Sequence, residues 1–168
     1  RPPRSTLFPS TTLFRSFEAA VENGELGEAD LFDESYAPIA NTNPQQLMTR
    51  FVAFTDRILP ALQEPVLEID PRVVFCAAVD RNGYLPTHNL KFSRPQGTDV
   101  AWNIATSRNR RKFDDRTGLA AGRNRKPFLV QTYRRAMGSG QFQLMKDVSA
   151  PIMVRGRHWG GLRLAYKV

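Results

Sequence analysis

The stretch PFLVQTYRRAMGSGQFQLMKDVSAPIMVRGRHWGGLRLAYKV, residues 127–168, decides the expected fold. It holds three runs rich in β-branched and aromatic residues, separated only by the short linkers GSG and RGR. Linkers of this length join antiparallel neighbours, because a parallel crossover needs a dozen or more residues. The sequence therefore predicts a three-stranded antiparallel meander in this part of the chain.

A helical pattern precedes the strand-rich part of the chain. An Asn-Pro pair at residues 43–44 suits a helix N-terminus, and apolar residues then recur at steps of three or four. We therefore expect a long amphipathic helix over residues 43–69, which Pro60 and Pro65 should kink or split. The preceding residues, 17–41, read as a helix end followed by a polar linker.

The stretch RVVFCAAVDRNGYLPTH, residues 72–88, has a β-rich run on each side of Asn82-Gly83. Asn-Gly is typical of a type I′ hairpin, because both central residues of that turn need positive φ. Short helices are expected after it, over residues 100–107 and 115–121. With the meander, these elements predict one α+β domain over residues 42–168, built on a five-stranded antiparallel sheet with a long N-terminal helix and helices packed on one face.

The first sixteen residues need a separate interpretation. The segment TLFPSTTLFRS, residues 6–16, resembles the translated sequencing-library adapter TLFPYTTLFRS and departs from it only at Ser10. A secretory signal is disfavoured, because Pro9 and several hydroxyl residues interrupt the apolar run and no small-residue cleavage site follows. We expect residues 1–16 to be a non-native, unpacked tail. Burial of four side chains would contradict this expectation: Leu7, Phe8, Leu13 and Phe14.

Excluding that segment lowers the positive charge that remains to be explained. The chain has 24 Lys and Arg against 16 Asp and Glu, a net charge of +8; without the three arginines of residues 1–16, 21 basic residues remain and the net charge is +5. A moderately basic domain fits an anion pocket, a solvated face or a nucleic-acid surface. The single Cys76 excludes an intramolecular disulfide, and its apolar surroundings favour an inert buried thiol.

The order of the expected elements resembles that of PAS-like and Cache-like sensor domains. VDRNGYLPTHN resembles the first hairpin of such a domain, and MKDVSAPIMVRGRHWGGLRLAYKV resembles its closing strand pair. NRRKFDDRTGLAAGRN, PFLVQTYRRAMG and GRHWGGLRLAYKV together resemble the C-terminal sensor-like region of bacterial methyl-accepting chemotaxis proteins. The resemblance covers residues 17–168, and its sheet portion spans residues 72–168.

This resemblance implies a non-enzymatic module that senses a small molecule or relays a signal to a coiled-coil signalling domain. No heptad array is present in the sequence, so we expect that signalling domain upstream in the same chain. The resemblance also implies a homodimer through the long helix and a cytoplasmic location within a receptor that can be membrane-anchored, with the periplasm as an open alternative. It implies no cofactor and no metal.

A pocket in such a domain lies between the sheet and its helices, and is mostly apolar with a few placed polar groups. Tyr133 shares a strand face with Gln131, and either lines this pocket or is a core aromatic. Trp102 lines the pocket or packs in the core. The candidate ligand-binding residues are His88, Trp102, Arg110, Arg111, Tyr133 and Asp147.

Charged residues leave two interpretations open. The arginines of SRNRRKFDDR can hold a carboxylate or phosphate of an anionic ligand, or form a surface salt-bridge network. Asp147, an acid inside a strand, can face a ligand amine or bond an arginine. His88 and His158 have no carboxylate at ligand spacing, which disfavours a metal site.

Two other functional classes remain to be compared with sensing. The sequence has no G-x-S-x-G, phosphate-binding glycine loop or H-E-x-x-H motif, which disfavours an enzyme. A basic nucleic-acid-binding domain is the alternative function, because basic clusters lie near Trp102, Phe113 and Tyr133. Such a protein shows a steep salt dependence of affinity, whereas a sensor pocket is stabilised by its ligand.

Overall fold

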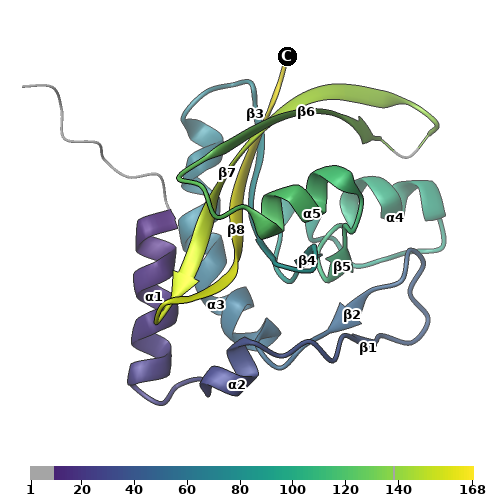
Figure 1. The fold of residues 1–168 in the computed structure, drawn as a ribbon. Helices are drawn as coiled ribbons and strands as arrows, with labels where there is room; N and C mark the ends of the chain where they lie inside the picture. Colours follow the sequence, from purple (N-terminus) through teal and green to yellow (C-terminus); the bar gives the residue numbers. More distant parts are fainter. Residues whose placement is uncertain (1–9, 138) are drawn as a thin grey trace, which may run out of the picture.

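The chain folds into an α+β domain in which an antiparallel sheet carries helices (Figure 1). The computed structural model describes residues 10–137 and 139–168. In chain order the elements are α1 (Ser10–Glu22), α2 (Glu28–Leu31), β1 (Ala37–Pro38), β2 (Leu47–Met48), α3 (Val52–Gln63), the 3₁₀ helix η1 (Pro65–Glu68), β3 (Val73–Asp80), β4 (Tyr84–Leu85), the 3₁₀ helix η2 (Leu90–Phe92), α4 (Val100–Thr106), β5 (Arg111–Lys112), α5 (Arg116–Arg123), β6 (Leu129–Ala136), β7 (Phe142–Val154) and β8 (Arg157–Lys167).

The expected C-terminal meander is confirmed. Strands β6, β7 and β8 pair antiparallel in sequence order, and β3 pairs with the other edge of β8, so the sheet runs β3-β8-β7-β6. Arg155 and Gly156, between β7 and β8, have φ values of 49° and 77°. Positive φ at two successive residues is what a type I′ turn requires. The two short helices expected before the meander are also present, as α4 and α5.

Helices cover both faces of the sheet, so the expectation of helices on one face is wrong. Helix α1 packs along β7 and α3 along β3, whereas α5 packs on β8, β3 and β7 from the opposite side (Figure 1). Side chains alternate along β3: Cys76 and Ala78 join the core beneath α1 and α3, while Phe75 and Ala77 belong to the cluster on the other face. Both β3 and β8 are therefore buried on both faces.

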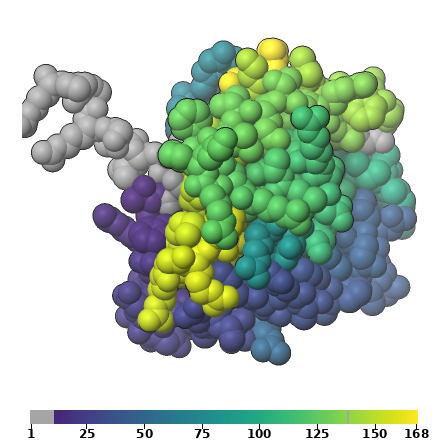
Figure 2. Space-filling view, viewed as in Figure 1, coloured from purple at the N-terminus to yellow at the C-terminus, as the bar shows by residue number. Residues whose placement is uncertain are grey.

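Helix α5 lies very close to the sheet because its inner face is made of small residues. Gly118 and Gly122 are four residues apart and share that face. An added Cβ at Gly122 would collide with the carbonyl oxygen of Asp80, and one at Gly118 with that of Phe113. In the space-filling view, the green segment that includes α5 and β6 covers the upper and central part of the visible face (Figure 2). This close approach fixes α5 and the loop before it against the sheet.

The five-stranded sheet and its Asn82-Gly83 hairpin are wrong. Strand β4 does not pair with β3 but forms a separate two-stranded sheet with β5. Gly83 has a φ of 82°, whereas Asn82 does not have positive φ, so the turn is not type I′. The Asp80 carboxylate organises this turn instead: its Oδ1 accepts the backbone N–H groups of Asn82 and Tyr84 at 2.8 and 2.9 Å.

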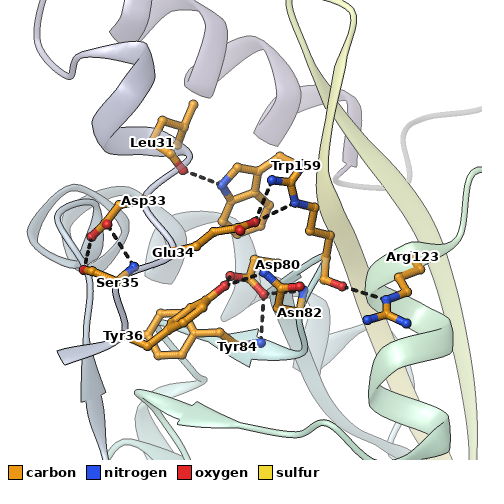
Figure 3. A network of polar contacts seen from close by, with 11 residues as sticks. Leu31, Asp33, Glu34, Ser35, Tyr36, Asp80, Asn82, Tyr84, Arg123 and Trp159 are labelled. Carbon is orange, nitrogen blue, oxygen red and sulfur yellow. Dashed lines mark hydrogen bonds and ion pairs between the residues drawn. The ribbon is translucent and has the colours of Figure 1, made fainter. Parts of the chain in front are cut away.

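A polar network fixes the same turn to the N-terminal part of the chain (Figure 3). The Tyr36 hydroxyl donates to Asp80 Oδ2 at 2.6 Å and accepts a hydrogen bond from the Asn82 side chain at 2.9 Å. The Trp159 indole N–H, nearby on β8, donates to the Leu31 carbonyl at the end of α2 at 2.9 Å. Bonds between such distant parts of the sequence cannot be read from local turn signals, which is why the Asn-Gly pair misled the prediction.

The long helix over residues 43–69 is also wrong, because within that range the chain is helical only over α3, from Val52 to Gln63, and over the short 3₁₀ helix η1. The Asn-Pro pair at residues 43–44 lies in the loop between β1 and β2, where the Thr42 side chain caps the turn by accepting the Gln46 N–H at 2.9 Å. The predicted break at Pro65 is confirmed, since η1 begins there, whereas Pro60 lies inside α3. The apolar stripe of α3 faces the domain's own core.

The expected unpacked tail is wrong for residues 10–16. These residues form the first half of α1, and Leu13 is only 1% exposed in the main core, next to Phe17 at 0%. Leu13, Phe17 and Ala20 fall at helical steps of four and three, so one stripe of α1 continues across the boundary of the adapter-like segment. Phe14 is only half-buried, and Leu7 and Phe8 lie outside the described residues.

Candidate functional site

A cavity of about 250 Å³ lies between one face of the sheet and the segment that runs from α4 to the start of α5. The strands β3, β6 and β8 form one wall, and the loop around Arg108 and β5 forms the other. Five arginines line it, together with one exposed carboxylate, that of Asp115: Arg108, Arg111, Arg134, Arg135 and Arg163. The cavity is therefore lined by an unusual concentration of positive charge.

Two of these arginines, Arg135 and Arg163, project from the sheet. Alternation along β6 places Arg135 on the same face as Tyr133, and Arg163 lies opposite Ser149 and Ala77 on the neighbouring strands. Arg163 is 5% exposed, and its Nε donates to Asp147 Oδ2 at 2.9 Å, so it has a buried counterion.

Arg135 is as deeply buried as Arg163 but has no such counterion. It is 3% exposed, and its Nε is buried without a hydrogen-bond partner. Its guanidinium lies 4.3 Å from the ring centre of Phe92 and 5.3 Å from that of Phe75. Burial lowers the pKa of Arg135, because the charged form loses its hydration. Aromatic faces offset part of that cost, while the Nε–H group stays unsatisfied.

Two further arginines, Arg108 and Arg111, come from the segment opposite the sheet. Each guanidinium lies 5.0 Å from the ring centre of Phe113, and each donates to the carbonyl oxygen of Ile104, at 3.0 and 3.4 Å. Burial, followed by the field of Arg135, lowers the pKa of Arg108 to about 9; burial lowers that of Arg111 to about 10. Both groups stay charged at neutral pH, but each would be stabilised by an anion.

His88 closes the inner end of the cavity as a neutral side chain. It is 2% exposed, and burial, followed by the field of Arg108, lowers its pKa well below the usual range. Its Nδ1 accepts the backbone N–H of Asn89 at 2.8 Å, which leaves Nε2 as the protonated nitrogen and a hydrogen-bond donor. The ring contacts Phe75 and Phe92 edge-on, at centroid distances of 5.1 and 4.9 Å.

The structure brings only some of the candidate residues together. His88, Arg111 and Tyr133 line the cavity, and Asp147 lies behind it as the partner of Arg163. Trp102 is 42% exposed on α4, so it lines neither the cavity nor the core. Arg110 turns away with a φ of 58° and pairs with Asp56 at 2.7 Å.

The sequence analysis left four pocket arginines out of the candidate site. Arg108 stood in the same charged stretch as Arg111, and Arg163 has no charged neighbour that marks it. Arg135 could have been found, because period-two alternation from Tyr133 puts it on the same strand face. Adjacent Arg134 also lines the cavity, but it is exposed, its guanidinium lies 4.6 Å from the ring centre of Phe142, and alternation along β6 puts its side chain on the face opposite Arg135.

Neither the protein-family models nor the curated proteins include a match to this chain. Within residues 10–137 and 139–168, the structure has no helix of the length and apolarity that crossing a membrane requires. Over the same part of the chain, no group of three or more His, Cys, Asp and Glu side chains is placed to hold a metal ion.

Proposed function

We propose that this domain binds a small anionic molecule in the arginine-lined cavity, as the non-enzymatic sensing module of a bacterial chemotaxis-type signal transducer. One observation carries the proposal: Arg135 is buried at the cavity with its Nε unpartnered. A buried guanidinium without a counterion is costly, and a carboxylate or phosphate oxygen would relieve that cost through charge-assisted hydrogen bonds. The sensory assignment rests in addition on the sequence resemblance to chemotaxis receptors.

The recessed position of the arginines favours a small molecule over a nucleic acid. Arg135 and Arg163 are almost fully buried, and the cavity of about 250 Å³ is closed at its inner end by His88. Nucleic-acid backbones are bound through cations that reach successive phosphates along an open surface. The cavity suits a ligand that enters and is surrounded.

A ligand in this cavity would contact two parts of the fold at once. Arg135 and Arg163 belong to the sheet, whereas Arg108 and Arg111 belong to the segment between α4 and α5. An anion that bridges them would favour one position of that segment relative to the sheet, and a signal requires such differential affinity for two states. Homodimerisation and a cytoplasmic location remain part of this proposal, although α3 is shorter than the helix first expected to mediate the dimer.

Ligand-dependent thermal unfolding tests the proposal. The protein is heated with each of a panel of small carboxylates and phosphates, and with their uncharged amide or alcohol analogues. At a ligand concentration of 100 times Kd, stabilisation of about 2.7 kcal/mol is expected, which raises Tm by roughly 5–10 °C for a domain of this size. Only the anions, and not their uncharged analogues, should raise Tm.

Two variants, each with one fewer positive charge, distinguish anion binding in the cavity from a nonspecific effect of the protein's net charge. Arg135→Gln should abolish the anion-dependent rise in Tm, whereas Arg116→Gln, an exposed position that does not line the cavity, should retain it. The proposal fails if no anion stabilises the protein, or if both variants respond alike. Affinity for DNA or RNA that falls steeply with salt would favour the nucleic-acid alternative.

A further inference from the structure

Four of the five cavity arginines form two pairs, each organised by one aromatic ring. Phe113 lies 5.0 Å from both Arg108 and Arg111, and Phe75 lies 5.3 and 5.6 Å from Arg135 and Arg163. We call these the loop pair and the sheet pair. The rings restrict the rotation of the long side chains, so the positive charges have fixed positions before any ligand arrives.

The two pairs differ in depth. Arg135 and Arg163, the sheet pair, are 3% and 5% exposed, whereas Arg108 and Arg111, the loop pair, are only partly buried. Both pairs line the same cavity, and the field of Arg135, after burial, contributes to the lowered pKa of Arg108. The positive charge therefore extends from the inner end of the cavity towards its mouth and is not concentrated at one point.

The charges at the two pairs leave an excess of two positive charges, without the solvent-exposed Arg134. The four arginines of the two pairs face two carboxylates, Asp147 behind the sheet pair and Asp115 at the rim. His88 adds no charge at neutral pH because it is kept neutral by burial. A ligand that compensates this excess carries two negative charges.

Resting on the proposed function, we infer that the ligand is a small dianion whose negative charges sit on two separate groups, with a short dicarboxylate as the simplest member of the class. One carboxylate binds at the sheet pair, where Arg135 has its free Nε, and the other binds at the loop pair. Leu85, Ile104 and Tyr133, which also line the cavity, provide the surface for the carbon chain between them.

Isothermal titration calorimetry on the full chain tests this inference with three probes: succinate, butyrate and inorganic phosphate. Succinate and butyrate have the same number of carbon atoms and differ in one carboxylate, and phosphate places its charge on a single group. Succinate should bind at least ten-fold more tightly than either of the others, because only succinate engages both pairs. Comparable binding of butyrate, or tighter binding of phosphate, overturns the inference.

Arg111→Gln tests the separate roles of the two pairs. A single carboxylate should occupy the sheet pair. This variant should therefore raise the Kd of succinate about ten-fold and leave the Kd of butyrate within two-fold of the wild-type value. Arg116→Gln, the matched control outside the cavity, should change neither. If Arg111→Gln lowers the affinities for succinate and butyrate equally, the two-group arrangement is overturned, whereas the proposal that the cavity binds anions still stands. If none of the three probes binds in the wild type, the proposed function itself fails.

Discussion

Replacing Leu13 by alanine tests whether the adapter-like segment is part of the core. Leu13 is 1% exposed and packs in the main hydrophobic cluster with Phe17. Leucine-to-alanine changes at buried sites cost about 2.7–5 kcal/mol, depending on how far the surroundings collapse. Near the start of α1 some collapse is possible, so we expect a loss of about 3 kcal/mol. Alanine is at least as good a helix former as leucine, so the loss reports packing and not helix propensity.

Urea denaturation at 25 °C, followed by far-UV circular dichroism, measures this loss directly. With a slope of about 2 kcal/mol per molar urea, the midpoint should fall by roughly 1.5 M. Leu90→Ala is the matched control, because Leu90 is 61% exposed and its truncation should change stability by less than about 0.5 kcal/mol. If Leu13→Ala behaves like Leu90→Ala, residues 10–16 do not pack, and the expectation of a loose N-terminal segment is restored.

Three further changes test the sheet, the cavity and the packing of α5. Asp147→Ala should lower the free energy of unfolding by about 3–5 kcal/mol, because it leaves Arg163 buried without its counterion; the double variant Asp147→Leu/Arg163→Met should recover most of this loss in urea titrations. His88 has a lowered pKa, so only the unfolded state takes up its proton as the pH falls; between pH 6.5 and 5.5 the wild type should lose about 1 kcal/mol more stability than His88→Gln. Gly122→Ala should destabilise by about 1–3 kcal/mol and lower Tm, since its Cβ would meet the backbone of the sheet, whereas Gly97→Ala, in open space, should not.

The part of the fold that could be predicted from the sequence is the part governed by local rules. Short linkers required antiparallel pairing of β6, β7 and β8, and the structure has it. Asp99 and Asp115 cap α4 and α5 through their side chains, and both helices start within a residue of the expected positions. Each of these features depends on residues that are close in sequence.

The errors arose where distant residues compete with a local signal. The Asn82-Gly83 pair indicated a hairpin, but Asp80 binds the backbone of that turn and Tyr36, forty-four residues away in sequence, completes the network. Strand β3 pairs instead with β8, and no sequence pattern near residue 80 indicates this long-range pairing. The Asn-Pro pair at residues 43–44 similarly indicated a helix start but lies in a loop.

The candidate site likewise combines features that local sequence patterns predict with features that depend on distant parts of the chain. Alternation along β6 predicted that Tyr133 and Gln131 share a face, and the structure confirms this through the registers of β6 with Asp147 and Met145. The same alternation applies to Arg135, which was nevertheless not among the candidate residues, and an adjacent pair of arginines in a strand is equally compatible with a solvated face. Whether a charged strand residue faces water or a cavity depends on what covers that face, and the cover here is the segment from α4 to α5.

The cost of burying Arg135 links the stability of the domain to its function. Contacts with Phe75 and Phe92 contribute about 0.5–2 kcal/mol each, whereas removing an ion from water costs several kcal/mol. The remainder is relieved only when an anion binds, so Arg135→Met should raise the stability of the ligand-free protein by about 1 kcal/mol or more and abolish its response to anions. Urea titrations with and without succinate measure both effects. A loss of stability in the ligand-free variant would mean that Arg135 is a structural residue, because the free protein would then already compensate its charge.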